Sequence, residues 1–566
     1  MPRSCIQISQ PQWIAAIAIV LAMLLAGCSA SAPVTQPAAN NSAPLLAEPA
    51  STASSERSPA DTKDSQPQRI HAASPNQAST ATSPVADAAT ELPAQPAGNS
   101  PKLQPPPPFT GWAKPAVALF ITGQQLGYIE PCGCTGLENQ KGGLARRHTL
   151  LRQLRDDRGW PVVALDVGSQ VRRYGRQQEL KFQHTASALR TLGYSSVVLG
   201  ASDLKLPVGE LFSGTNPDDK PSIFTAANVA LLGREFQPPF QVIESGGKKI
   251  GMVGVLGDSF EQKLTGDELQ HQPALDGLKN SCRELKAQNC DYHVLLAHAT
   301  PDEARSIAIE IPLFDLVVCA GGSSLPSNEM EAIEGSKSKF VNVSHKAMHA
   351  GVVGLFDDRS TPIRYAVVPL DAQLKDSPEM LELLANYQAQ LKSEGLEGLG
   401  LKPQPLPSGN QFVGSETCGE CHTKAMAVWS KTTHAHATDS LVHPPNSRGK
   451  IARHYDPECL SCHVTGWDPQ KFIPLASGYL SLTATPKLQH NGCENCHGPG
   501  SAHVAAENGD GTDSQRSKLR ASMRLPVAGG AAENKCRECH DEDNSPDFGH
   551  KGFAEYWKKV EHYGKD

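Results

Sequence analysis

Aromatic residues are scarce in this sequence, and long hydrophobic runs are scarcer still. Phe, Trp and Tyr make up 5% of its 566 residues, and only one segment, at the N-terminus, is apolar enough to meet a membrane. This excludes a membrane protein with several spans. Lys and Arg (52) nearly balance Asp and Glu (59), so the net charge of −7 gives no reason to expect nucleic-acid binding. The 15 cysteines are too few for a small disulfide framework, so their positions matter more than their number.

The N-terminus has the organisation of an export signal. Arg3 precedes an apolar run from Trp13 to Ala26, and the run ends at Cys28 in Leu-Ala-Gly-Cys. This resembles a bacterial lipobox, which implies that residues 1–27 are removed and that Cys28 is lipidated. An ordinary signal peptide with a chance cysteine is the alternative. We therefore expect an exported protein, lipid-anchored to a membrane facing the periplasm or the cell surface, and Ser29 favours the outer membrane.

The segment after the signal has too few large apolar side chains to form a core. Of the 80 residues at 29–108, 51 are Ala, Pro, Ser or Thr and none is aromatic. Such a composition is typical of disordered chain with polyproline stretches. We predict a disordered tether over residues 28–111 that holds the folded part away from the membrane.

Four copies of Cys-x-x-Cys-His lie in the last third of the chain. The copies are Cys418–His422, Cys459–His463, Cys493–His497 and Cys536–His540. Two thiols at this spacing can each add to a vinyl group of one haem, and the adjacent histidine then becomes the proximal iron ligand. A zinc ribbon or a set of disulfides would leave the four adjacent histidines unexplained. The motifs predict four covalently bound haem c groups attached through Cys418, Cys421, His422, Cys459, Cys462, His463, Cys493, Cys496, His497, Cys536, Cys539 and His540.

Eight further histidines in this region are available as distal iron ligands. They are His434, His436, His443, His454, His490, His503, His550 and His562. A second imidazole closes the iron for electron transfer, whereas an open position suits small-molecule chemistry. The residues alone do not distinguish ligands from surface histidines.

The C-terminal sequence resembles the tetrahaem cytochrome c-554 family. The resemblance covers about 413–566 and is carried by Thr-His434-Ala-His-Ala, by Cys-His-Val-Thr-Gly466 and by Cys-His-Gly-Pro-Gly-Ser-Ala-His503. It implies three bis-histidine haems and a five-coordinate haem at the second motif. It makes His434, His503 and His562 the candidate distal ligands, with His436 and His550 as weaker ones. Short helices and irregular chain are expected to surround the haems.

The middle of the chain alternates apolar runs with helical patterns. Most of the runs are β-branched and fully apolar, as buried strands are. We expect strands at 116–122, 161–167, 196–199, 250–256, 292–297 and 313–319 and a helix at 143–155. The pattern predicts a layered α/β domain at 112–372, followed by a helix and linker at 373–412 and the haem domain at 413–566.

The order of these pieces resembles the metallophosphatase domain of 5′-nucleotidases, a calcineurin-like sandwich. The resemblance is carried by 120–127, by Gly142-Gly-Leu-Ala-Arg-Arg147, by Ala-Ala-Asn228-Val and by Leu-Leu-Ala-His298. The metal ligands of that family are replaced. Gln124, Leu126, Ser169, Ala201 and Ser202 stand in their positions, the stretch Ala320-Gly-Gly-Ser323-Ser324 replaces a Gly-Gly-His-x-His motif, and only His298 remains. Two metals would need bridging carboxylates, so we predict a degenerate site without phosphoesterase activity.

Five cysteines of the middle region remain unassigned. Cys132 and Cys134 flank a glycine and are a speculative site for a soft metal, and a cluster with Cys319 and His298 is conceivable. Plain thiols or a disulfide are the alternative. Cys282 and Cys290 flank a helical stretch and are simplest as a structural disulfide.

Three functions are left open by the sequence. The favoured one is a membrane-anchored tetrahaem cytochrome that exchanges electrons with other periplasmic or membrane redox proteins, with no nucleic-acid partner. The second is an oxidoreductase acting on a small nitrogen or sulfur species at a five-coordinate haem or a cysteine cluster. A 5′-nucleotidase-like hydrolase is the third, and the lost metal ligands argue against it. No catalytic residue is assigned.

Overall fold

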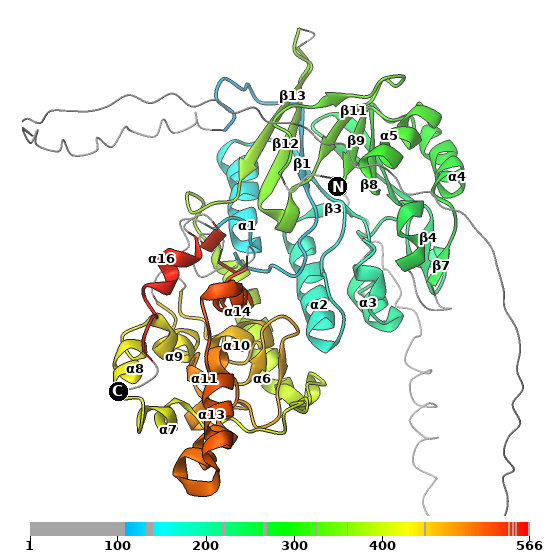
Figure 1. Cartoon of the computed structure of the whole chain (residues 1–566). Coiled ribbons are helices and arrows are strands. Elements are labelled where there is room, and N and C mark those ends of the chain that lie inside the picture. The colour runs from blue at the N-terminus through cyan, green and yellow to red at the C-terminus, as the bar shows by residue number, and fades with distance from the viewer. Residues whose placement is uncertain are drawn as a thin grey trace, which may run out of the picture. The chain divides into compact units, whose positions relative to one another are not determined.

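The computed structural model describes most of the chain from residue 108 to residue 563. The segments outside the description are 132–139, 218–220, 264–268, 323–324, 359, 446–448, 542–543, 546–547 and 550–551. Residues 101–566 form one compact unit (Figure 1). The predicted signal peptide, the lipidation site Cys28 and nearly all of the tether lie outside the described residues. Among the residues that are described, no helix is both long and apolar enough to cross a membrane.

Two mixed β-sheets form the centre of the middle region. The first has the order β13-β12-β1-β2-β3 and the second the order β10-β11-β9-β8-β6-β5. The strands of the first sheet are β1 (Val117–Thr122), β2 (Val162–Asp166), β3 (Tyr194–Val197), β12 (His349–Leu355) and β13 (Ile363–Pro369). Those of the second are β5 (Phe240–Ser245), β6 (Lys248–Leu256), β8 (Tyr292–His298), β9 (Leu316–Cys319), β10 (Glu331–Ala332) and β11 (Lys339–Asn342). A separate ribbon pairs β4 (Val229–Leu231) with β7 (Leu269–His271).

The sheets pack face to face because the strand period of two sends alternate side chains to opposite sides. On β1, the buried residues Val117, Leu119 and Ile121 join residues of β6, β8 and β9 in one apolar cluster between the sheets. Ala118 and Phe120, which alternate with them, point to the other side and pack under helices. The central strands are buried on both faces, which explains their unbroken apolar sequences.

Helices cover the outer face of each sheet (Figure 1). Residues of α1 (Leu144–Arg152), α2 (Arg176–Thr191) and α6 (Pro378–Gly398) share the cluster of the first sheet. Residues of α4 (Ala274–Lys286) and α5 (Pro301–Glu310) share that of the second sheet. The short helix α3 (Val208–Thr215) contributes Leu211 to the first cluster. The result is a four-layered α/β/β/α sandwich, so the predicted layered α/β class is confirmed.

The predicted strands correspond to β1, β2, β3, β6, β8 and β9, with ends that differ by up to three residues. The strands that the sequence analysis did not identify are the antiparallel edge strands and the hairpins, including β5, β12 and β13. The side chains of β5 and β13 are mostly half-buried, so their sequences lack a continuous apolar run. The predicted helix at 143–155 is α1, whose last turn widens into a π-helical turn at Gln153–Asp157.

Helix α6 connects the sandwich to the C-terminal region. The Ser377 hydroxyl caps it by accepting the backbone N–H of Met380 at 3.4 Å, and Pro378 opens the first turn, as the sequence predicts. Met380, Leu384, Tyr387 and Leu391 are buried against the first sheet's cluster. The helix runs to Gly398, inside the stretch of residues 373–412 where the sequence predicts a helix and a linker.

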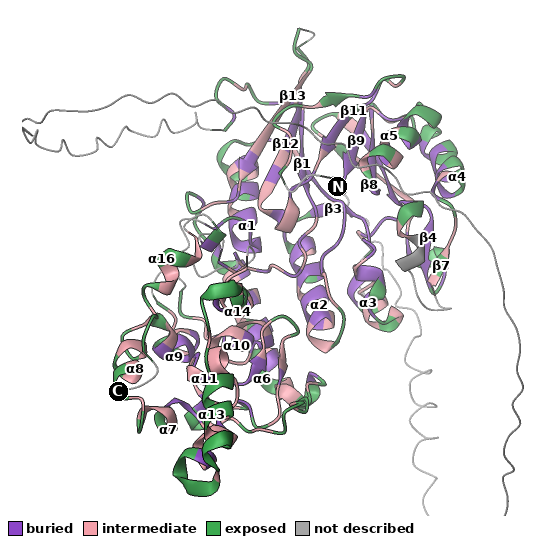
Figure 2. Cartoon of the chain, in the orientation of Figure 1, coloured by how far each residue is buried: buried purple, intermediate pink, exposed green. Residues whose placement is uncertain are grey.

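The C-terminal region consists of short helices joined by irregular chain, as predicted. The helices are α7 (Ser415–Gly419), α8 (Thr423–Trp429), α9 (Ala437–Val442), α10 (Pro457–His463), α11 (Cys493–His497), α12 (Ser501–Ala505), α13 (Asp513–Ser522), α14 (Ala531–Arg537) and α16 (Phe553–Trp557). A two-stranded ribbon pairs β14 (Trp467–Asp468) with β15 (Ile473–Pro474). The apolar cluster of the C-terminal region is small and includes Leu460, Trp467 and Tyr479. Figure 2 shows the contrast, because the sheets are largely purple while α8, α13 and α16 are pink and green.

Candidate haem-attachment site

Each Cys-x-x-Cys-His motif begins in or coincides with a short helix. Helix α10 holds the second motif and α11 the third, whereas α7 and α14 hold the first cysteine of the first and fourth motifs. Residues three apart on a helical turn lie on one side, so the two thiols of a motif face the same direction. All eight cysteines are free thiols. Their spacing and exposure suit the attachment of one haem c per motif.

Three of the four proximal histidines are oriented by a hydrogen bond at Nδ1. The Nδ1 of His463 lies 2.8 Å from the carbonyl of Ala437, and that of His497 lies 2.6 Å from the carbonyl of Met523. A carbonyl can only accept, so the proton sits on Nδ1 in both rings. The Nδ1 of His540 lies 3.1 Å from the Ser545 hydroxyl. Such partners fix the ring and leave Nε2 to bind iron, which is the usual support of a metal-bound histidine.

Three proximal histidines face a second histidine across a gap of the right size. The ring centroids are 6.3 Å apart for His422 and His503 and 5.8 Å for His497 and His562. For His434 and His540 they are 6.0 Å apart. An imidazole nitrogen binds a first-row metal at about 2 Å, so two rings on one metal have centroids roughly 6 Å apart. The donor set therefore fits bis-histidine haem iron at the first, third and fourth motifs.

These pairs also show which proximal ligand each candidate distal ligand faces. His503 follows the third motif by six residues in sequence but faces His422 of the first. His434 follows the first motif but faces His540 of the fourth. His562, close to the C-terminus, faces His497 of the third. Sequence reasoning selected these three histidines but gave no signal for their pairing, because each pair joins segments at least 65 residues apart.

The second motif has a different environment. Among the ring contacts of the described residues, none brings another imidazole to His463. The remaining histidines lie elsewhere. His436 and His490 face each other at 6.4 Å, His454 packs on Tyr455, His443 is exposed, and His550 lies outside the described residues.

Burial keeps the His434 ring neutral. Desolvation, with smaller contributions from His540 and His463, lowers its pKa to about 4. Burial also lowers the pKa values of His497 and His540. The neutral imidazole is the form that binds a metal, so these sites are suited to coordination at any physiological pH.

Thiols of different motifs meet, and their contacts order the motifs in space. Cys418 of the first motif is hydrogen-bonded to Cys493 of the third. Cys496, also of the third, lies within electrostatic range of Cys536 of the fourth. Cys462 of the second motif is hydrogen-bonded to Cys539 of the fourth. The four motifs therefore follow each other as first, third, fourth and second.

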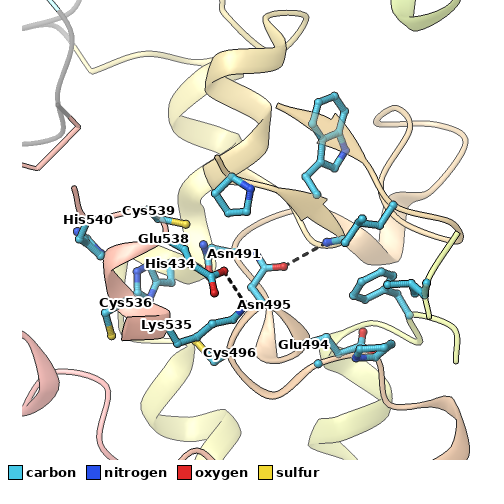
Figure 3. A pocket seen from close by; sticks show the side chains of 18 residues that line it. His434, Asn491, Glu494, Asn495, Cys496, Lys535, Cys536, Glu538, Cys539 and His540 are labelled. Carbon is cyan, nitrogen blue, oxygen red and sulfur yellow. Dashed lines mark hydrogen bonds and ion pairs between the residues drawn. The ribbon is translucent and has the colours of Figure 1, made fainter. Parts of the chain in front are cut away.

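A pocket of about 250 Å³ lies where the third and fourth motifs meet (Figure 3). Cys496, Cys536, Cys539, His540 and the facing His434 line it. Figure 3 shows that Lys535 and Glu538 form an ion pair at its edge, with Nζ and Oε2 at 2.7 Å. Its lining also includes the apolar side chains of Phe412, Trp467 and Leu475. An apolar wall with a cationic side chain at the edge is suited to a large flat ring that carries carboxylates.

One buried carboxylate connects the first and third motifs. Glu494 lies between the two cysteines of the third motif and is 2% exposed. Its oxygens accept the backbone N–H groups of Val413 at 3.0 Å, Gly414 at 2.8 Å and Gly500 at 2.8 Å. Gly414 precedes helix α7, and Gly500 precedes helix α12, which carries His503. Glu494 thus fixes the start of helix α7, which carries Cys418 of the first motif, relative to the start of helix α12, which carries His503.

In the middle region, small polar side chains surround His298 at the positions where the sequence analysis expected metal ligands. The Ser169 hydroxyl lies 3.4 Å from His298 Nε2 and 3.1 Å from the Ser202 hydroxyl. The Nδ1–H of His298 donates to the carbonyl of Val167 at 2.9 Å, and Gln124 donates to the carbonyl of Ala320. In the described part of the chain, no three His, Cys, Asp or Glu side chains are grouped so that they could hold a metal ion.

The predictions for the middle-region cysteines need correction. Cys132 and Cys134 lie outside the described residues. Cys319 pairs with Ala297 in the sheet and points toward the helices, whereas the next residue on β8, His298, points to the other face, so these two do not cluster. The Cys319 thiol instead donates to the carbonyl of Ala299 at 3.3 Å. Cys282 and Cys290 are free thiols, so the predicted disulfide is wrong: Cys282 packs in the apolar layer under α4.

Comparisons with known proteins agree with two of the three resemblances. The family model described as cytochrome c554 and c-prime matches residues 417–498. Cytochrome c-554 of Nitrosomonas europaea is 28% identical over 148 residues, which are 24% of this chain and 60% of that protein. An apyrase of Tabanus yao is 23% identical over 321 residues, which are 52% of this chain and 57% of that protein. The chain thus spans about 60% of the length of the curated relatives it matches.

Solved structures resemble the middle region. A 5′-nucleotidase precursor from Thermus thermophilus covers 59% of this chain and 68% of its own, with 17% identity and a TM-score of 0.42. A calcineurin-like phosphoesterase from Bacillus subtilis covers 48% of this chain and 97% of its own, with 14% identity and a TM-score of 0.38. The C-terminal region is therefore similar to c-type cytochromes and the middle region to the metallophosphatase group. The likeness of the N-terminus to a lipoprotein signal stays a prediction.

Proposed function

We propose that this protein is a tetrahaem electron-transfer cytochrome joined to a phosphatase-like domain that does not hydrolyse phosphate esters. The observation that carries the proposal is the opposition of three proximal histidines to three distal ones at 5.8–6.3 Å. Haem c bound there supplies a one-electron carrier with a closed coordination sphere. The residues of the chain attach, orient and desolvate it.

The contacts among the motifs support a linear relay. The thiols that join neighbouring motifs give the order first, third, fourth, second, so the first and second haems are the ends of the relay. Electrons enter or leave at these ends through contact with redox proteins of the periplasm or membrane. The lipidated Cys28 anchors the protein, and residues 28–111 tether it. These assignments of location and partner rest on the sequence.

The haem count and the coordination state are tested together. We expect four haem c groups per chain by the pyridine haemochrome assay and three low-spin irons with one high-spin iron by EPR of the purified protein. Replacing Cys459 and Cys462 by Ala removes one haem and the high-spin signal. The matched replacement of Cys282 and Cys290 by Ala leaves four. A wild-type protein that lacks covalent haem would refute the proposal.

A second function is supported by His463, which faces no other imidazole among the described residues. If the second haem is five-coordinate, its iron can bind a small nitrogen or sulfur species, and the protein is then an oxidoreductase. Nitric oxide or hydroxylamine shifts the high-spin signal in that case and leaves the low-spin signals unchanged. Four low-spin irons that do not respond would leave electron transfer alone. For the phosphatase-like domain, we expect no phosphate release from nucleotides with Mn²⁺ or Mg²⁺.

A further inference from the structure

The phosphatase-like domain binds the chain directly before the second haem motif. Four of its side chains reach a stretch of six residues, Arg453 to Glu458, that directly precedes Cys459. The contacts of Arg453 are bidentate, with Nε and Nη2 at 2.5 and 2.6 Å from the two carboxylate oxygens of Glu130. Arg453 is 7% exposed, so this ion pair is largely desolvated. The loop that begins at Gly127 is thereby fixed to the cytochrome region.

Helix α2 supplies three of the four side chains, from one face. Gln177 donates to one oxygen of Asp456 at 2.8 Å, and Gln388 of α6 donates to the other oxygen at 3.1 Å. Asp456 is the N-cap of α10 and also accepts the backbone N–H of Glu458 at 3.0 Å. The cap of the second haem helix is thus held from both sides by side chains outside the haem region.

The contact nearest the attachment cysteine is an ion pair. Lys181 Nζ lies 2.7 Å from Glu458 Oε2, and Gln178 donates to the other Glu458 oxygen at 3.1 Å. The side chain of Lys181 is 5% exposed and that of Glu458 is 30% exposed. Glu458 adjoins Cys459 and shares helix α10 with His463, about 7.5 Å away along the axis. Among the described residues, no comparable ion pair joins the sandwich to the other three motifs.

We propose that Lys181 is a positioning residue through which the phosphatase-like domain sets the reduction potential of the second haem. This rests on the proposed function, since it requires haem on that motif. A positive charge held near an iron stabilises the reduced, less positive state, and a negative charge stabilises the oxidised one. Lys181, whose side chain is almost buried, neutralises the partly exposed carboxylate of Glu458. In this proposal the phosphatase-like fold adjusts the reduction potential of the haem at one end of the relay.

The test is a potentiometric titration of the full-length holoprotein, fitted to four one-electron steps. In Lys181→Met, one step moves to a lower potential by about tenfold in its equilibrium constant, which is about 59 mV for one electron. In Glu458→Gln, the same step moves upward. The double variant returns toward wild type, and Lys181→Arg stays there. The matched change Lys471→Met, at an exposed pair with Asp468, moves no step.

Several results would overturn the inference. One is four haems whose potentials are the same in wild type, Lys181→Met and Glu458→Gln. Another is an equal shift of all four steps, which would indicate general loosening of the fold. The opposite signs in the two single variants keep the test informative if one of them is produced poorly. A wild-type protein without c-type haem would instead refute the proposed function, so the two failures are distinguishable.

Discussion

The buried carboxylate of Glu494 offers a sharp test of how the first and third motifs are held together. We consider Glu494→Ala, which removes the acceptor of three backbone N–H groups, those of Val413, Gly414 and Gly500. The three donors come from two separate segments, 413–414 and 500. No other side chain replaces the acceptor in the described structure, so the change leaves the donors to water or without partners.

The size of the effect follows from the number of bonds and their burial. A hydrogen bond to a charged group contributes about 1.5–3 kcal/mol, and a buried donor left unpaired costs about 1–3 kcal/mol. The summed cost of three unpaired donors is larger than the free energy that hydrogen bonds to entering water can restore. We expect a loss of about 3–5 kcal/mol, which is a large share of the 5–15 kcal/mol typical of a domain. Glu494→Gln keeps one acceptor oxygen and loses less.

Two measurements check this. Denaturant unfolding followed by Soret absorbance gives the stability of the haem region, and EPR gives the fraction of high-spin iron. Because Gly500 precedes the helix that carries His503, we expect Glu494→Ala to release His503 from the first haem and raise that fraction. The control is Glu533→Ala, whose exposed i,i+4 pair with Arg537 contributes about 0.3–0.5 kcal/mol. Equal stabilities for the Glu494 and Glu533 variants would refute the reasoning.

Two other predictions concern ligation and pH. His503→Ala should convert one low-spin iron to a high-spin iron in the EPR spectrum. His436→Ala, which changes an exposed ring facing His490, should leave the spectrum unchanged. The reverse result would contradict the assigned pairs. Burial lowers the pKa of His349 to about 4, so the folded state holds it neutral while the unfolded state protonates near pH 6.5. Stability should fall by about 3 kcal/mol as pH drops from 6.5 to 4, and His349→Gln should flatten that slope in denaturant titrations read by circular dichroism.

Local features of the sequence determine much of this structure. The Cys-x-x-Cys-His motifs are contiguous, so their chemistry is readable without knowledge of the fold. The central strands are buried on both faces, and their apolar runs are equally visible. The distal ligands are different, because His434 and His540 are 106 residues apart and only the tertiary fold brings their rings together. Nothing in the spacing of histidines along the chain encodes that pairing.

For the cysteines of the middle region, the sequence suggested contacts that the structure does not have. Cys319 and His298 end adjacent strands, and a cluster was conceivable because strand ends of such a fold meet at one edge. The strand period of two places them on opposite faces of the sheet, which only the register of β8 and β9 reveals. Cys282 and Cys290 are eight residues apart, a separation that permits a disulfide but does not require one. The apolar environment of Cys282 favours a buried thiol instead.

Charged side chains of the phosphatase-like domain form ion pairs with the cytochrome region. A domain kept only as a spacer would need no matched charges with its neighbour, yet Glu130 and Lys181 meet Arg453 and Glu458, and the cation of each pair is almost buried. Removing one partner of such a pair is costly because it leaves an uncompensated charge. These contacts converge on the second motif, which is one end of the relay and the one whose proximal histidine faces no imidazole among the described residues. Among the described residues, the charged contacts of the phosphatase-like fold therefore reach the second motif and not the other three.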